Sequence, residues 1–147
     1  MKIIVIGGGA AGFFAAINCA ENYPNSQVIL LESGAKVLSK VLISGGGRCN
    51  VTNSCFDVAT LVLNYPRGGK VLRGAFTRFQ PQNTINWFTQ RGVKLKTESD
   101  NRVFPITDNS ATIANCLIDS AINAGVKIMT NSPVINVEFN PHPPTPS

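Results

Sequence analysis

The chain has 147 residues, of which 44% are hydrophobic and 14% charged, a composition typical of a globular domain with a real core. No apolar run approaches the roughly 20 residues that span a bilayer, so no membrane association is expected. The formal net charge is +5, but the Lys and Arg residues are spread along the sequence. A mildly basic surface therefore explains the charge better than a nucleic-acid partner does.

The reactive side chains are few. The four cysteines form no Cys-x-x-Cys pair, which argues against a redox-active dithiol. Cys19 and Cys116 fall on expected helices among apolar residues, so both are expected to be buried. The single histidine, His142, lies in a Pro-rich segment, so neither a zinc site nor a His-based triad is expected. Glycines 7–9 interrupt the apolar start, which therefore does not read as a signal peptide, and a cytoplasmic location is expected.

The beginning of the chain predicts a strand–helix–strand unit. Residues 2–6 are rich in Ile and Val, which is typical of a strand buried on both faces. Residues 10–22 predict a helix with a broad apolar face, ended by the turn around Pro24. A second apolar strand follows at 27–31. Such a unit forms a right-handed crossover between parallel strands.

Shorter elements are expected after this unit. Residues 33–53 read as a long loop, followed by helices over 70–79 and 82–90. Two short strands, 93–98 and 102–104, flank a turn at Asp100-Asn101.

The last part of the chain predicts one more helix and two strands. The helix covers 109–124, carries Ile113, Leu117 and Ala121 on one stripe, and ends at Gly125. A third apolar strand follows at 126–130. Residues 134–139 alternate as a strand of a separate antiparallel layer, and residues 141–147, with four prolines, are expected to be disordered.

The first motif is Gly7-x-Gly9-x-x-Gly12, placed between an expected strand and an expected helix. Gly7 allows a tight turn, Gly9 lets a pyrophosphate approach the backbone, and Gly12 lets helix and strand pack closely. Glu32 follows about 20 residues later, where an acidic group accepts hydrogen bonds from ribose hydroxyls. Dinucleotide binding is therefore favoured over a Gly-rich turn of an unrelated α/β fold. Glu32 disfavours a nucleotide that carries a 2′-phosphate on this ribose, but it is compatible with both NAD and FAD.

The second motif covers residues 40–53 and contains three successive glycines at 45–47. Their amides could form an anion cradle, and Arg48 adds a permanent positive charge with a fork of donors. A second contact loop is what an FAD site needs, and the alternative is a flexible surface loop. Cys49 is the cysteine nearest to this expected ligand; a structural or flavin-contacting role is favoured over a reactive thiol.

These two motifs, together with Arg102-Val-Phe-Pro105, resemble the BaiN-like NAD(P)/FAD-dependent oxidoreductases, a family often labelled aminoacetone-oxidase-family flavoproteins. The block Ser-Gly-Gly-Gly-Arg-Cys-Asn is the most specific part, and the resemblance runs from Met1 to about Phe139. Asn101 stands where relatives usually have glycine, but Asn tolerates a left-handed conformation. The resemblance implies a Rossmann-like FAD-binding fold of the glutathione-reductase type with the start of an antiparallel β-meander, and residues 1–140 would form part of this domain.

The resemblance also implies the site. The FAD pyrophosphate would lie against Gly7, Gly9, Ala10, Ala11 and Gly12, and the adenosine ribose would bind Glu32. The pyrophosphate and the flavin would be approached by Lys40, Ser44, Gly46, Gly47, Arg48, Cys49 and Asn50. Val134 would touch the adenine through its backbone. The implied activity is flavin-mediated hydride transfer to a small-molecule substrate, with NAD(P)H as electron donor, and no residue stands out as an acid–base catalyst.

Members of the resembled family are longer than this chain. The expectation is therefore a partial domain in which the flavin ring lacks one wall, with weak FAD retention or none. Two alternatives stay open: a non-catalytic remnant that binds nucleotide weakly or not at all, and an NAD-binding dehydrogenase domain. A tRNA-modifying flavoprotein would rest on fold-level analogy and net charge alone.

Overall fold

The computed structural model describes residues 1–139, so the segment 141–147 that was expected to be disordered lies outside the described residues. The described residues form two three-stranded sheets. The parallel sheet has the order β1 (Lys2–Ile6), β2 (Gln27–Leu31), β6 (Lys127–Met129). The antiparallel sheet has the order β3 (Thr52–Asn53), β5 (Arg102–Pro105), β4 (Leu95–Thr97). A parallel sheet built on a βαβ unit confirms the Rossmann-like α/β fold class.

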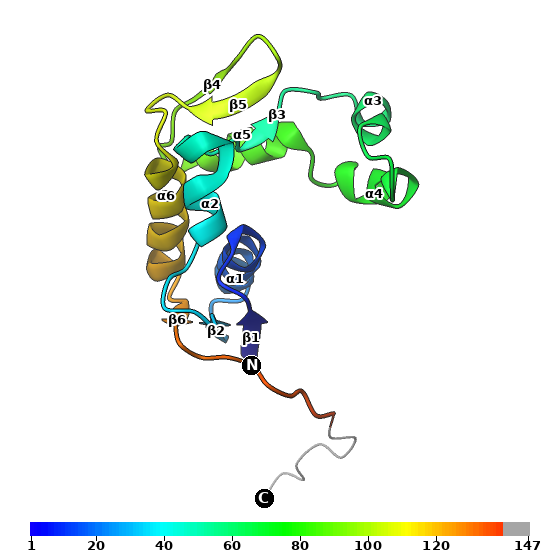
Figure 1. Cartoon of the computed structure of the whole chain (residues 1–147). Helices are drawn as coiled ribbons and strands as arrows, with labels where there is room; N and C mark the ends of the chain where they lie inside the picture. The colour runs from blue at the N-terminus through cyan, green and yellow to red at the C-terminus, as the bar shows by residue number, and fades with distance from the viewer. Residues whose placement is uncertain (140–147) are drawn as a thin grey trace, which may run out of the picture.

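Helices connect and separate the two sheets (Figure 1). Three of them lie between the sheets: α1 (Ala10–Asn22), α2 (Ser39–Ile43) and α6 (Ser110–Asn123). A short 3-10 turn, η1 (Ser44–Gly47), continues α2. The remaining helices are α3 (Val58–Leu63), α4 (Gly69–Phe76) and α5 (Pro81–Gln90). Figure 1 shows α3 and α4 projecting from the rest of the molecule.

The first βαβ unit has the bounds that the sequence predicts. β1 and β2 pair in parallel from Lys2 opposite Gln27 to Ile6 opposite Leu31. β1, however, is an edge strand of the described sheet, and the side chains of Ile4 and Ile6 are 55% and 59% exposed. The expectation of a strand buried on both faces is therefore wrong for β1, because helices cover only one of its faces.

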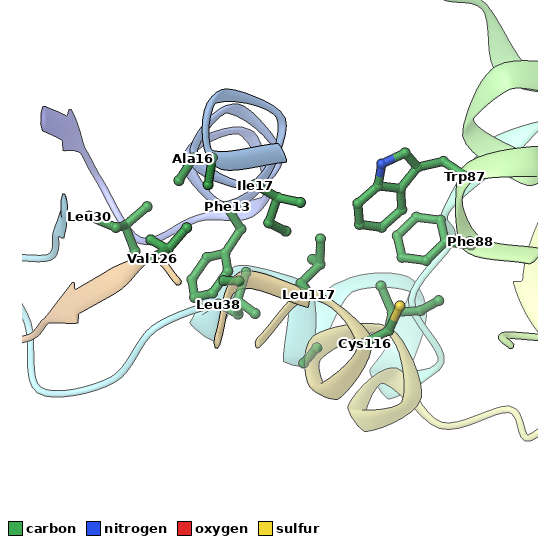
Figure 2. Packing of buried hydrophobic residues seen from close by; sticks show 14 of the residues in the cluster. Phe13, Ala16, Ile17, Leu30, Leu38, Trp87, Phe88, Cys116, Leu117 and Val126 are labelled. Carbon is green, nitrogen blue, oxygen red and sulfur yellow. The ribbon is translucent and has the colours of Figure 1, made fainter. Parts of the chain in front are cut away.

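The core lies between α1, α6 and the parallel sheet (Figure 2). Phe13 and Ile17 of α1 are fully buried, as is Leu30 of β2. The predicted stripe on α6 is confirmed, because Ile113, Leu117 and Ala121 are all buried. Of the two helical cysteines, Cys116 is buried and Cys19 only half-buried.

Several local structures differ from the sequence expectation. The stretch 33–53, read as a loop, contains α2, η1 and β3, and α3 was not predicted. Residues 134–139 form no strand: the side chains of Ile135, Val137 and Phe139 are 95%, 77% and 90% exposed. Their alternation is a strand pattern, but none of strands β1–β6 pairs with them, and an unpaired strand leaves its backbone groups unsatisfied.

Candidate functional site

The turn from β1 into α1 is built from glycines, most of which the fold itself requires. Gly7 has φ +102°, a conformation that favours glycine. A Cβ at Gly12 would overlap the carbonyl oxygen of Gly7. A Cβ at Gly8 would lie 2.9 Å from Val37 Cγ1 and 3.0 Å from Glu32 Cβ. The close approach at Gly8 was not predicted, because its neighbours come from the end of β2 and the loop after it.

Gly9 is different, because nothing inside the described protein requires it to be glycine. Its φ of −89° and ψ of −176° are open to any residue. A Cβ built on Gly9 meets no protein atom within 4 Å. Gly9 is the N-cap of α1, which has neither a side-chain cap nor an acidic residue in its first turn. The free N–H groups and the positive dipole end of the helix therefore face open space, which is the arrangement that binds phosphates.

Glu32 is fixed beside this turn at the end of β2. Its Oε2 accepts a hydrogen bond from the Gly8 amide at 2.8 Å. Its Oε1 accepts from the Gly34 amide at 2.7 Å and from Ser33 Oγ at 3.1 Å. The Gly34 amide, followed by the Gly8 amide, holds the pKa of Glu32 below its ordinary value. The carboxylate is thus ionised and oriented, and Oε2 keeps a lone pair for a further donor such as a ribose hydroxyl.

Replacing Glu32 with glutamine is expected to make stability less dependent on acid pH. The contribution of the carboxylate is fully present above its ordinary pKa of 4.5. It falls as the pH drops through the lower pKa of the folded chain, and it is absent below that value. The difference in urea midpoint between wild type and Glu32→Gln should therefore shrink from about pH 6 to about pH 3. Glu138→Gln, a matched change remote from the turn, should leave the midpoint unchanged, and a pH-independent difference for Glu32→Gln would contradict this account.

A cavity of about 650 Å³ opens at the N-terminus of α1, within the usual size range of ligand sites. Seven of the residues that line it were predicted for the site: Gly9, Ala10, Ala11, Lys40, Ser44, Cys49 and Asn50. The other lining residues are mainly apolar and come from several elements: Phe14, Val41, Val51, Phe79, Thr84, Trp87, Phe88, Ile113 and Leu117. The cavity can therefore hold a flat apolar group against these rings and a polar or anionic group beside Lys40 and the N-terminus of α1.

An aromatic cluster forms one wall of this cavity. The ring centroid of Phe14 lies 5.0 Å from that of Phe79 and 5.5 Å from that of Trp87. Trp87 also packs edge-on against Phe88 at 4.9 Å, and both lie at the end of the core remote from Leu30 (Figure 2). Trp87 Nε1 is buried without a hydrogen-bond partner among the described residues.

Sequence reasoning missed this aromatic wall. Phe14 follows the buried Phe13 on α1 and reads as part of the same apolar face, while Trp87 and Phe88 read as the core side of α5. Only the packing of α1 against α5 shows that these rings border a cavity.

The second motif is divided between the cavity and the antiparallel sheet. The three glycines at 45–47 have φ values of +56°, +67° and +84°, and this tight turn directs Cys49 and Asn50 into the cavity wall. Gly46, Gly47 and Arg48 do not line the cavity, and neither do Gly7, Gly12, Glu32 and Val134. Their predicted contacts to FAD stay predictions.

Arg48 faces the β4–β5 hairpin. Its Nη1 lies 2.6 Å from Glu98 Oε1 and 3.4 Å from Asp108 Oδ1. Its guanidinium lies over the Phe104 ring, 4.0 Å from the centroid. Glu98 raises the pKa of Arg48 further, mainly through this hydrogen bond. In this arrangement Arg48 fastens the glycine turn to the hairpin, so it positions the neighbouring residues that line the cavity.

Cys49 is buried, and burial raises the pKa of its thiol. The thiol is therefore protonated near neutral pH, which favours the structural or ligand-contacting role over the reactive one. Within residues 1–139, no group of three or more His, Cys, Asp or Glu side chains is placed to hold a metal ion. None of the helices described is long and apolar enough to cross a membrane.

Comparisons with known proteins agree with this geometry. The family model described as "HI0933-like protein Rossmann domain" matches residues 1–143. The 3-dehydro-bile acid delta(4,6)-reductase of Clostridium scindens is 31% identical over 129 residues, which are 88% of this chain and 31% of that protein. The ribosomal RNA dihydrouridine synthases of Escherichia coli and Haemophilus influenzae are 28% and 29% identical, over 91% and 92% of this chain and 32% of each relative.

The chain thus spans about a third of the length of these curated relatives. Among solved structures, that of Thermovibrio ammonificans THI4 is similar with a TM-score of 0.54 and 12% identity. The match covers 88% of this chain and 38% of that one. At this identity the likeness concerns the fold.

Proposed function

The chain belongs to the HI0933-like Rossmann-domain family, and from that premise we propose that it holds FAD as part of a flavin-dependent oxidoreductase with NAD(P)H as electron donor. The observation that carries the proposal is Gly9. It is a glycine that neither the backbone conformation nor the packing requires, and it stands at the mouth of a cavity of about 650 Å³. A ligand that passes close to the backbone would explain why this position is glycine.

The residues present fit FAD in three parts. Glu32 lies on one side of the α1 N-terminus, where its carboxylate would bind the ribose of the adenosine half. The free N–H groups at Ala10 and Ala11, with the Lys40 ammonium nearby, would bind the pyrophosphate. The cavity, which Glu32 does not line, would receive the flavin ring.

The mainly apolar lining of the cavity favours FAD over NAD. Nicotinamide is a small polar ring, whereas the flavin is a larger three-ring system with an apolar edge. A wall formed by Phe14, Trp87 and Phe88 suits the larger ring. Ser44 and Asn50 also line the cavity. The Ser44 hydroxyl donates to the Val41 carbonyl at 2.8 Å, so its oxygen is left to accept a hydrogen bond from the edge of a flavin.

Bound flavin would supply the hydride chemistry, while this chain would bind it, orient it and exclude water. Among the cavity residues described, no side chain is proposed as an acid–base catalyst; burial raises the pKa of the Cys49 thiol, so this group would not act as a base near neutral pH. The curated relatives are named for a bile acid and for ribosomal RNA. We propose the RNA class for this chain, because exposed cations that form no ion pair within residues 1–139 gather on α4 and its flanks. We also propose that the protein works in the cytoplasm.

The single tryptophan gives a direct test of FAD binding. Trp87 lines the cavity, so a flavin that enters it should quench the tryptophan fluorescence in a saturable manner. We expect quenching by FAD at lower concentration than by NAD, and competition by ADP at the shared adenosine site. Trp87→Phe should remove the signal while equilibrium dialysis still detects bound FAD. Equal responses to NAD and FAD would favour an NAD-binding domain, and no saturable response would favour a remnant without nucleotide binding.

A further inference from the structure

The positive charge of the chain comes from one stretch of sequence. Residues 58–97 contain seven Lys and Arg residues and not one Asp or Glu. The other residues contain six basic and eight acidic side chains, so they carry a slight negative excess. The charges appear spread along the sequence because several positions separate each cation from the next.

Folding gathers four of these cations on a projecting arm, which we define as residues 58–79 and call the α3–α4 arm. Its two helices pack against each other and stand apart from the sheets (Figure 1). Arg67, Lys70, Arg73 and Arg78 are exposed and form no ion pair with any residue of the described chain. By contrast, four body cations are paired with carboxylates: Arg48, Arg91, Lys96 and Arg102.

Aromatic rings accompany these cations. Tyr65 is 41% exposed, and its ring packs against that of Phe76 with centroids 5.5 Å apart. Phe56, just before the arm, is 44% exposed. Cations that bind phosphates, next to aromatic faces that stack on bases, form the combination that binds single-stranded nucleic acid.

The arm fits RNA better than it fits a membrane surface. Membrane affinity of an amphipathic helix scales with the apolar area that it can insert. On α4, Leu72 and Phe76 are partly buried, and the strongly exposed apolar side chains of the arm are Leu63 and Val71, on different helices. The exposed apolar side chains are thus divided between two helices rather than gathered on one insertable face, whereas the four exposed cations can contact a phosphate backbone.

The α3–α4 arm ends at the cavity. Phe79, its last residue, is 39% exposed, lines the cavity and contacts Phe14 with ring centroids 5.0 Å apart. We propose that the α3–α4 arm is a binding surface for single-stranded or looped RNA, which it holds so that one unstacked base reaches the mouth of the cavity. This role rests on the proposed function, since an enzyme that acts on a base must take that base out of its stack.

The test measures binding of a fluorescein-labelled RNA stem-loop by anisotropy at several salt concentrations. The arm variant combines Arg67→Gln, Lys70→Gln and Arg73→Gln. The matched control removes the same charge from exposed lysines elsewhere, with Lys2→Gln, Lys36→Gln and Lys127→Gln. We expect the arm variant to lose at least about tenfold in affinity near 100 mM salt. The negative slope of the logarithm of the association constant against the logarithm of the salt concentration should become about 2 smaller in magnitude. The control should stay within about threefold of wild type.

Three outcomes would overturn the proposal: no RNA binding by the wild type at low salt, equal losses in both variants, or arm-dependent binding to phosphatidylserine vesicles without RNA binding. Circular dichroism and the urea midpoint establish that each variant is folded. FAD is absent from this assay, and the arm variant should still give the FAD-dependent quenching of Trp87. Failure of RNA binding and failure of FAD binding are therefore separate results.

Discussion

Replacement of Gly12 by alanine is expected to destabilise the chain by about 3 kcal/mol or more, a large part of the stability of a small domain. The added Cβ would overlap the carbonyl oxygen of Gly7 and lie 3.4 Å from Leu30 Cδ1. Because the Gly7 carbonyl is backbone held in the turn, α1 would have to move away from β1. That movement would disturb Phe13 and Ile17, which are fully buried.

The measurement is the urea midpoint, followed by circular dichroism, with Gly74→Ala as the matched control. Gly74 lies within α4, and a Cβ there meets no atom within 4 Å. The same substitution at Gly74 is expected to be neutral or to stabilise by up to about 1 kcal/mol, because alanine favours the helix. A Gly12→Ala variant as stable as wild type would show that α1 does not depend on the close contact with Gly7.

The βαβ unit could be predicted from sequence because its signals are local. The apolar runs, the turn at Pro24 and the glycine spacing fix strand, helix and strand within about 30 residues. The exposure of β1 could not be predicted, since it depends on the order of strands and on which faces the helices cover. For α3 a signal did exist: Asp57 accepts hydrogen bonds from the Thr60 amide and hydroxyl, which is an N-cap pattern. The N-cap of α2, Leu38, has a left-handed conformation and provides no side-chain cap, so the sequence offers no such signal for this helix.

The candidate site also has a part that could be predicted from the sequence and a part that could not. The glycine turn and Glu32 could be placed because each acts within one short motif. The direction of Arg48 could not, because it is set by Glu98 and Asp108, which lie 50 and 60 residues further along the chain. The cationic α3–α4 arm could not be predicted for a related reason. Its cations are separated along the sequence, and only the packing of α3 against α4 brings them together.

Gly9→Ala should have the opposite profile to Gly12→Ala, with FAD binding lost and the fold retained. The backbone angles of Gly9 suit alanine, and its new Cβ would meet no protein atom within 4 Å. Alanine is a slightly poorer N-cap than glycine, but it lowers the entropy of the unfolded chain. Stability should therefore stay within about 1 kcal/mol of wild type. The Cβ would instead occupy the space through which a pyrophosphate reaches the α1 amides, and the FAD affinity should fall about 100-fold or more.

Quenching of Trp87 by FAD, read beside the urea midpoint, separates the two glycines. Loss of quenching with an unchanged midpoint in Gly9→Ala assigns the open space at the α1 N-terminus to a ligand, because no contact within the described protein has been altered. Unchanged quenching would mean that FAD, if it binds, does not pass close to the backbone at Gly9. The argument for FAD at this turn would then fail, while the requirement for Gly12 in the fold would still hold, since that requirement depends only on a contact between α1 and Gly7.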